Sequence, residues 1–282
     1  MRGIMQSIRL LILSSLWTLL LIFSAPASKA QDSGRPITAV YALEVGARSA
    51  LSEYLSPIAY HGVSYAAEGE WSKVMPFAPE KAMMRFEGRV AYASMLNPAG
   101  SASMLAVEGR FAWQMRRIWR LPNALTLSVG GGPAIEAGAT SLLRNSNNPV
   151  AVDLKAFIEA GAGITWRSRI GRLPILLADR LSLPILGAFF MPQYGETYYE
   201  IWLGNHSGLA HFGWPGNMAG VDNMLSCSLD FGKTALFIGY HFRLSTASAC
   251  HLSNRSILHG LTIGVIPFGL GMKRKSAGIR PY

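Results

Sequence analysis

The stretch LAVEGRFAWQ (residues 105–114) alternates between two kinds of side chain. Its odd-numbered residues are apolar or Gly, whereas its even-numbered residues include Glu108, Arg110 and Gln114. Successive side chains of a β-strand point to opposite faces, so such a strand is apolar on one face and charged on the other. The stretches VSYAAEGEWS (63–72) and RFEGRVAY (85–92) repeat the pattern. Many such strands after an export signal are typical of a transmembrane β-barrel.

The first thirty residues are typical of a secretory signal peptide. Arg2 and Arg9 precede an apolar run, and Ser28-Lys29-Ala30 forms a small-x-small cleavage site. An uncleaved anchor is the alternative, because the apolar run approaches the length of a short membrane-spanning helix. We predict three parts: a signal peptide (1–30), an outer-membrane barrel (31–272) and a basic C-terminal tail (273–282).

Ten antiparallel strands are predicted, separated by Gly- and Pro-containing joins such as Asn97-Pro98-Ala99-Gly100. Their ranges are 37–48, 60–74, 82–95, 103–118, 124–137, 151–168, 176–191, 221–232, 234–246 and 256–268. An even number returns both ends of the chain to the periplasmic side. A twelve-strand barrel is the alternative, because residues 195–203 also alternate.

The tryptophans predict the orientation of the barrel. Trp71, Trp113, Trp119 and Trp166 fall near the ends of even-numbered strands, beside turns rich in Lys and Arg. Aromatic rings prefer the headgroup level, so we assign them to one periplasmic girdle. The longer joins, at 49–59, 138–150, 192–220 and 247–255, are then extracellular.

One predicted strand, 176–191, carries adjacent charges. Either parity places Asp179 or Arg180 toward lipid if the whole stretch spans the membrane. An Arg at the middle of the lipid face of a barrel costs about 2 to 4 kcal/mol, and an Asp costs less. We therefore expect a longer turn before this strand, with the spanning part beginning near Leu181.

Composition narrows the classes of partner. Removing residues 1–30 takes away Arg2, Arg9 and Lys29 and lowers the formal net charge from +10 to +7. The remaining bases are spread over turns and strands and not along one stripe, so nucleic acid is not an expected partner. Contact with anionic lipid headgroups at the rims explains them better. The predicted pairing separates Cys227 and Cys250 by about 30 Å, too far for a disulfide.

Charged residues on the inward face predict a plugged lumen. With turns centred near Ala78 and between Pro98 and Ala99, carboxylates lie opposite guanidinium groups across three strands. The expected lumen network comprises Glu68, Glu70, Arg85, Glu87, Arg89, Glu108 and Arg110, with Glu70 opposite Arg85, Arg89 opposite Glu108, and Glu87 opposite Arg110. Asp153, Lys155, Glu159, His241 and Arg243 are expected to face inward on other strands, and Gly130 and Gly132 to leave room for Arg110. Side chains fill the interior of small barrels, which favours a structural plug. A narrow ion path and a catalytic carboxylate pair are the alternatives.

The segment 193–217 is the richest in side chains that carry chemistry, and loops of this length are often functional. A hydrolase hypothesis takes Ser207 as nucleophile, His206 or His211 as base, and Glu196, Glu200 or Asp222 as the orienting carboxylate. Outer-membrane phospholipases and lipid A deacylases separate His and Ser by one residue, whereas His206 and Ser207 are adjacent and would face opposite sides of a strand. The favoured interpretation is an aromatic, hydrogen-bonded lid. Candidate ligand-binding residues are Tyr194, Tyr199, Trp202, Asn205, Asn217 and, from another loop, Asn145. We expect neither a metal nor a cofactor.

Four stretches carry a resemblance to a known family. They are residues 56–62 (SPIAYHG), 69–73 (GEWSK), 142–149 (LLRNSNNP) and 193–211. Together they resemble an uncharacterised domain-of-unknown-function family of exported proteins from Gram-negative bacteria, and the resemblance covers most of the mature chain. It implies an outer-membrane barrel and assigns no catalytic residues.

These observations predict an outer-membrane β-barrel of unassigned activity, with a lumen largely plugged by charged side chains and extracellular loops that form a binding or gating element. The alternatives are a lipid-modifying hydrolase of the deacylase or phospholipase type and a narrow solute channel. Enzymatic activity is not the favoured interpretation. The expected partners are outer-membrane lipids and, during biogenesis, the barrel-insertion machinery.

Overall fold

The computed structural model describes residues 37–75, 77–78, 81–145, 148–204, 208–232 and 234–267. Its elements are β1 (Ile37–Ser52), β2 (Ser56–Val74), β3 (Ala82–Leu96), β4 (Ser103–Arg120), β5 (Leu125–Ser141), β6 (Val150–Ile170), β7 (Leu173–Phe190), α2 (Tyr198–Trp202), β8 (Ala210–Gly213), β9 (Met218–Asp230), β10 (Thr234–Ala249) and β11 (Leu252–Pro267). The predicted signal peptide and the basic tail lie outside the described residues.

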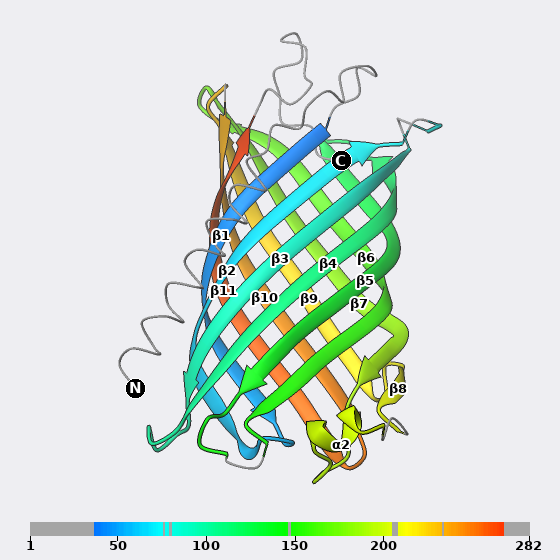
Figure 1. The fold of residues 1–282 in the computed structure, drawn as a ribbon. Coiled ribbons are helices and arrows are strands. Elements are labelled where there is room, and N and C mark those ends of the chain that lie inside the picture. The colour runs from blue at the N-terminus through cyan, green and yellow to red at the C-terminus, as the bar shows by residue number, and fades with distance from the viewer. Residues whose placement is uncertain are drawn as a thin grey trace.

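Ten of the strands close into an antiparallel barrel (Figure 1). β1 pairs with β11, and β6 pairs with β7, which in turn pairs with β9. The short β8 lies beside the end of β7, where Ala188 pairs with Phe212. The predicted fold class and the count of ten barrel strands are confirmed.

The twelve-strand alternative is wrong. Residues 198–202, which alternate like a strand, form the short helix α2. Thr197 and Glu200 form a capping box at its start, in which each residue bonds the backbone of the other. This local hydrogen bonding favours a helical turn over another strand.

Two of the four predicted long loops are short in the structure. We call the end where β1 begins and β11 finishes the termini rim, and the opposite end, which carries α2, the α2 rim (Figure 1). At the α2 rim the predicted long joins at 49–59 and 247–255 are tight turns, because β1 and β2 are separated by residues 53–55 and β10 and β11 by Cys250 and His251. Those two residues have φ of 53° and 61°, the left-handed conformation that a two-residue hairpin turn requires.

The expected long turn before β7 is also wrong. β7 begins at Leu173, so residues 171–172 alone separate it from β6. Arg180 points inward and pairs with Glu70, while Asp179 is exposed on the outer wall. Asn223 Nδ2 donates to Asp179 Oδ1 over 2.7 Å, so a neighbouring side chain on β9 partly replaces water at this carboxylate. Because Glu70 pairs with Arg180 inside the barrel and Asn223 bonds Asp179 outside, these two charged residues can lie within the strand.

The barrel wall separates apolar from charged side chains. Its outer surface carries exposed Leu43, Tyr65, Phe111 and Ile263, and Trp119 and Trp166 are exposed close to the termini rim. This is the surface that a membrane-spanning barrel presents to lipid. No helix in the described part of the chain is long and apolar enough to cross a membrane.

Apolar clusters lie at both ends of the lumen. The cluster toward the α2 rim includes Tyr54, Met104, Met191 and Met218. A smaller one toward the termini rim includes Val40, Leu176, Phe237 and Ile266. The charged residues of the interior lie between them.

Candidate functional site

Arg89 is a central residue of the charged lumen. Its guanidinium contacts Glu44 (Nη2 to Oε1, 2.7 Å), Glu68 (Nε to Oε1, 3.1 Å) and Glu108 (Nη1 to Oε1, 2.7 Å). The side chains of Arg89 and Glu44 are 2% and 0% exposed. Because three carboxylates, from β1, β2 and β4, surround this cation, its burial is compensated.

The predicted register of the two hairpins is wrong by two residues. Glu68 pairs with Arg89 across β2 and β3, and Arg89 pairs with Arg110 across β3 and β4. Three predicted ion pairs nevertheless form, along diagonals of the sheet: Arg85 with Glu70 at 3.1 Å, Arg89 with Glu108 at 2.7 Å and Arg110 with Glu87 at 3.7 Å. The long side chains span the offset, so the inward face and not the exact register decides which charges meet.

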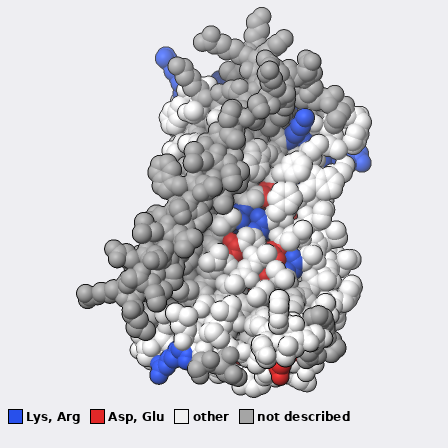
Figure 2. Space-filling view, viewed as in Figure 1, with Lys and Arg blue, Asp and Glu red and all other residues white. Residues whose placement is uncertain are grey.

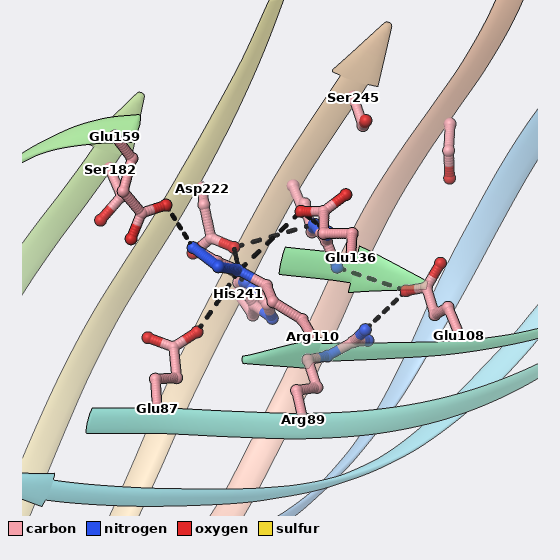
Figure 3. A network of polar contacts seen from close by, with 12 residues as sticks. Glu87, Arg89, Glu108, Arg110, Glu136, Glu159, Ser182, Asp222, His241 and Ser245 are labelled. Atoms are coloured by element: carbon pink, nitrogen blue, oxygen red, sulfur yellow. Dashed lines mark hydrogen bonds and ion pairs between the residues drawn. The ribbon is translucent and has the colours of Figure 1, made fainter. Parts of the chain in front are cut away.

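Arg110 and Gln114 connect this network to β6 and β7, and Arg110 also reaches across the lumen to β9, where its Nε lies 3.8 Å from Asp222 Oδ2. Arg110 Nη2 lies 2.5 Å from Glu159 Oε2 on β6, and Gln114 donates from Nε2 to Glu159 and to Ser182 Oγ. Figure 3 shows Arg110 between Glu159 and Asp222. The charges therefore cross the lumen and do not merely line it.

His241 lies between two carboxylates from different strands. Its Nδ1 is 2.5 Å from Glu44 Oε2, and its Nε2 is 3.3 Å from Asp222 Oδ1. An ionised carboxylate accepts hydrogen bonds and cannot donate them, so this geometry suits a doubly protonated ring. Arg243, two residues along β10, pairs with Glu136 and lies 3.3 Å from Glu108. Together these contacts extend the network over β1, β4, β5, β9 and β10.

Sequence reasoning missed the roles of Glu44, Glu136 and Arg180 in this network. Each lies on the inward parity of its strand, as Glu44 does between the inward Ala42 and Arg48. The alternation of inward and outward positions could therefore have identified these three residues as part of the lumen. The expected role of Gly130 and Gly132 is wrong, since a Cβ at either position would meet the backbone of β4. Other glycines do make room for side chains: a Cβ at Gly260 would lie 2.7 Å from Glu44 Cδ, and one at Gly161 would lie 2.6 Å from Arg116 Nη2.

Glu44, Glu68 and His241 are a geometric candidate for a metal ion, because one ligand atom from each lies within 4.8 Å of the others. Arg89 already bonds both carboxylates of this trio. A cation there would face the Arg89 guanidinium, so the donor set fits an ion pair better than a metal.

The cavities between the charged side chains are small. One of about 60 Å³ lies toward the α2 rim, lined by Arg48, Glu108, Glu136, Lys155 and Arg243 among others. Further cavities measure about 30 Å³ each. These volumes hold a few water molecules each.

Tyr54 and Tyr198 attach the α2 segment (residues 191–217, of which 205–207 are not described) to the barrel. Tyr54 Oη donates to the Glu196 carbonyl over 2.7 Å, and the Val152 amide donates to Tyr198 Oη over 2.7 Å. The two rings meet edge to face, with centroids 5.9 Å apart. Burial, with the negative groups nearby, raises the pKa of Tyr54 to about 12, and burial also raises the pKa of Tyr198. Both hydroxyls stay protonated at neutral pH.

The carboxylates proposed for the hydrolase hypothesis have structural partners. Glu196 accepts from the Gln193 amide, and Glu200 accepts from the amide and hydroxyl of Thr197, which lower the pKa of Glu200. His211 Nε2 lies 2.9 Å from the Met191 carbonyl and 3.8 Å from Cys250 Sγ. No hydrogen bond joins His211 to Glu196 or Glu200, all three of which are described. Asp222 lies in the lumen beside His241, whereas Asn205, His206 and Ser207 lie outside the described residues.

Two predicted ligand-binding asparagines are used within the fold. Asn217 accepts from the Trp214 amide and donates to the Phe212 carbonyl, closing the turn before β9. Asn145 Nδ2 donates to the Leu55 carbonyl over 3.4 Å. The three aromatic candidates behave differently, since Tyr194, Tyr199 and Trp202 are 78%, 69% and 82% exposed.

Residues 8–274 match the model of a family described as "Protein of unknown function (DUF3316)". The chain belongs to this family. The resemblance stated from the sequence, to an uncharacterised family, is thereby confirmed. No curated protein matches the chain.

Among solved structures, this DUF3316 chain is similar to barrels of autotransporters. The transport unit of AIDA-I from Escherichia coli is 8% identical, with a TM-score of 0.43 over 88% of this chain and 94% of that one. The translocator domain of NalP from Neisseria meningitidis is 10% identical, with a TM-score of 0.39 over 91% and 96%. The beta domain of the Bordetella autotransporter BrkA is 12% identical, with a TM-score of 0.36 over 83% and 100%. At such identities and TM-scores the similarity carries no argument about function.

Proposed function

We propose that this protein is an outer-membrane β-barrel with a closed lumen that displays a fixed aromatic binding surface outside the cell. The observation that carries the proposal is the contrast within the α2 segment. Tyr198 is bonded to Val152 and packed against Tyr54, whereas Tyr194, Tyr199 and Trp202 of the same segment are largely exposed. A soluble surface rarely exposes several large rings together unless they meet a partner.

The contacts inside the lumen support a scaffold role and not a transport role. Ion pairs cross the barrel interior from β3 to β1 and from β4 to β9, and apolar clusters lie above and below them. Opening a continuous path would separate buried charges from their partners, which is strongly destabilising. We therefore infer that the barrel holds the α2 segment in place and does not conduct in this conformation.

Two measurements test this proposal. Single-channel recording in planar bilayers should detect no stable conductance, and open channels in the wild-type protein would favour the channel alternative. Location is tested by cysteine labelling of intact cells in a variant without Cys227 and Cys250. A membrane-impermeant maleimide should label Trp202→Cys and leave Arg172→Cys, at the other rim, unlabelled until the cells are lysed. Labelling of Arg172→Cys alone would overturn the assigned orientation.

The binding surface is tested by its aromatic rings. A triple variant with Tyr194, Tyr199 and Trp202 changed to Ser should retain barrel stability, because these rings are exposed. The variant should no longer retain purified outer-membrane lipopolysaccharide. We choose this probe because it offers an external partner with apolar and sugar surfaces. Equal retention by the variant and the wild type would contradict a binding role for these residues.

A further inference from the structure

The two rims of the barrel differ in charge. Five exposed cations, which we call the basic patch, lie at the termini rim: Lys81, Arg117, Arg120, Arg169 and Arg172. Asp230 lies at the same rim but is buried, and its side chain accepts a hydrogen bond from the Gly232 amide. At the α2 rim, the exposed charges are mixed and include Arg144, Glu200 and Arg255. Figure 2 shows the same contrast on the visible face, with Lys and Arg toward the termini rim and both signs at the other end.

The basic patch spans neighbouring corners of the barrel. Arg117 pairs with Ala82 across β3 and β4, and the Ile118 amide donates to the Lys81 carbonyl over 2.7 Å. The turn between β4 and β5 reaches β6, where the Arg167 amide donates to the Ala124 carbonyl over 3.2 Å. Arg169 and Arg172 follow at the turn between β6 and β7. The pairing of these strands therefore gathers cations that are far apart in sequence.

Most of these cations have no carboxylate partner in the part of the chain that the structure describes. Within the described residues, Lys81, Arg117, Arg169 and Arg172 form no ion pair, unlike Arg89 and Arg110 in the lumen. Their exposure keeps them hydrated, and their like charges repel one another. Such a group gains free energy from an anionic surface that it meets from outside.

Tryptophans place the basic patch at a particular depth. Trp119 and Trp166 are 38% and 42% exposed on the outer wall, and the Arg117 guanidinium lies 5.4 Å from the Trp119 ring centroid. Exposed tryptophans of membrane barrels lie at the headgroup level. Arg117 and Arg120 flank Trp119, and Arg169 follows Trp166 by three residues, so these three cations lie within about 10 Å along the strands of the level where lipid phosphates lie.

We propose that the basic patch selectively binds phospholipids with net negative headgroups in the leaflet that meets the termini rim. The inference rests on the proposed insertion of the barrel in a membrane. Guanidinium groups match phosphate oxygens in geometry as well as charge. An acidic soluble protein fits less well, because the patch lies beside lipid-facing tryptophans and not on a face directed away from the membrane.

Spin-labelled lipids test the selectivity directly. The folded chain is inserted in phosphatidylcholine vesicles that contain either spin-labelled phosphatidylglycerol or spin-labelled phosphatidylcholine, and electron paramagnetic resonance measures the motionally restricted fraction. Each cation that meets a lipid phosphate should favour phosphatidylglycerol by about fivefold, which corresponds to about 1 kcal/mol per Lys or Arg. High salt should weaken the preference, since it screens exposed charges.

Matched variants separate the patch from general basicity. Changing all five patch cations to Gln should reduce the preference toward one, whereas Arg144→Gln with Arg255→Gln at the α2 rim should leave it unchanged. The double variant Arg169→Gln with Arg172→Gln should lower the preference for phosphatidylglycerol partially. It replaces the variant with five substitutions if that variant does not fold. A protein that inserts but shows the same preference after these changes refutes this inference alone. A chain that fails to insert in either lipid refutes the proposed function as well.

Discussion

Arg89 on β3 reaches Glu44 on β1, with Nη2 and Oε1 2.7 Å apart, although β2 lies between the two strands. The contact is possible because both residues lie on inward-facing positions of a narrow barrel. It joins strands that share no backbone hydrogen bonds. The same Glu44 also meets His241 from β10, so one carboxylate links the first strands of the barrel to the last ones.

Removing Arg89 should therefore have a large effect. Arg89→Ala leaves Glu44, Glu68 and Glu108 without a shared cation, and we expect the free energy of unfolding to fall by about 3 to 5 kcal/mol. Urea titration of the detergent-folded barrel measures it. The control is Val90→Ala, because Val90 follows Arg89 in the chain and is exposed on the outer wall. This change should lower the free energy of unfolding by less than about 1 kcal/mol. Similar small losses at both positions would mean that the lumen is wet enough to solvate the carboxylates.

A side chain at Gly260 should destabilise the barrel. A Cβ there would lie 2.7 Å from Glu44 Cδ, and that carboxylate is held by both Arg89 and His241. Gly260→Ala should destabilise the barrel by about 1 to 3 kcal/mol, the usual range for overpacking. Gly88→Ala is the matched control, since no atom lies within 4 Å of its Cβ position. A neutral Gly260→Ala in the same urea titration would show that Glu44 can move away freely.

The adjacent residues Asp179 and Arg180 should respond oppositely to neutralisation. Arg180→Gln removes a partner of Glu70 inside the lumen, and we expect a loss of about 1 to 3 kcal/mol. Asp179→Asn removes an exposed charge from the outer wall and preserves a polar group beside Asn223, so stability in lipid should be unchanged or higher. Refolding yields and urea midpoints in vesicles compare the two. A larger loss at Asp179 would contradict the inward assignment of Arg180.

Side-chain parity made much of the fold predictable. The period of two in residues 105–114 identifies the inward face of β4, and similar patterns place the strands to within a few residues. The register of the strands was harder to predict, because the position of each turn decides it. An error of one residue in the centre of a turn shifts the strand pairing by two residues. The predicted ion pairs still form, since arginine side chains are long enough to reach diagonal neighbours.

The lumen partners from distant strands and the helix α2 were not predictable in the same way. Glu44 and His241 meet only because the barrel closes, and no local pattern encodes which inward residues then face each other. Tyr198 and Tyr199 fit both a strand and a helical turn, and the capping box of Thr197 and Glu200 decides between them. Competing local patterns thus explain why a twelve-strand barrel was an alternative.

Tyr54 should hold the α2 segment closed over a wide range of pH. Its hydroxyl donates to the Glu196 carbonyl, and its pKa is raised to about 12. For a group whose pKa is raised in the folded state, the stabilisation is fully present below the ordinary pKa and is lost as the pH rises through the raised one. The contact should therefore persist through pH 10 and weaken near pH 12. Absorbance at about 295 nm should show late-ionising tyrosines, because burial also raises the pKa of Tyr198, and Tyr54→Phe should remove one of them.

The same substitution should loosen the α2 segment without unfolding the barrel. Losing one buried hydrogen bond costs about 0.5 to 1.5 kcal/mol, and here the cost falls on the attachment of residues 191–217. Amide hydrogen exchange of this segment should become up to about tenfold faster in Tyr54→Phe, while exchange in β3 and β4 stays unchanged. Tyr194→Phe, at an exposed ring in the same segment, is the control and should change neither. Equal exchange in Tyr54→Phe and the wild type would show that packing against Tyr198, and not the hydroxyl, keeps the segment in place.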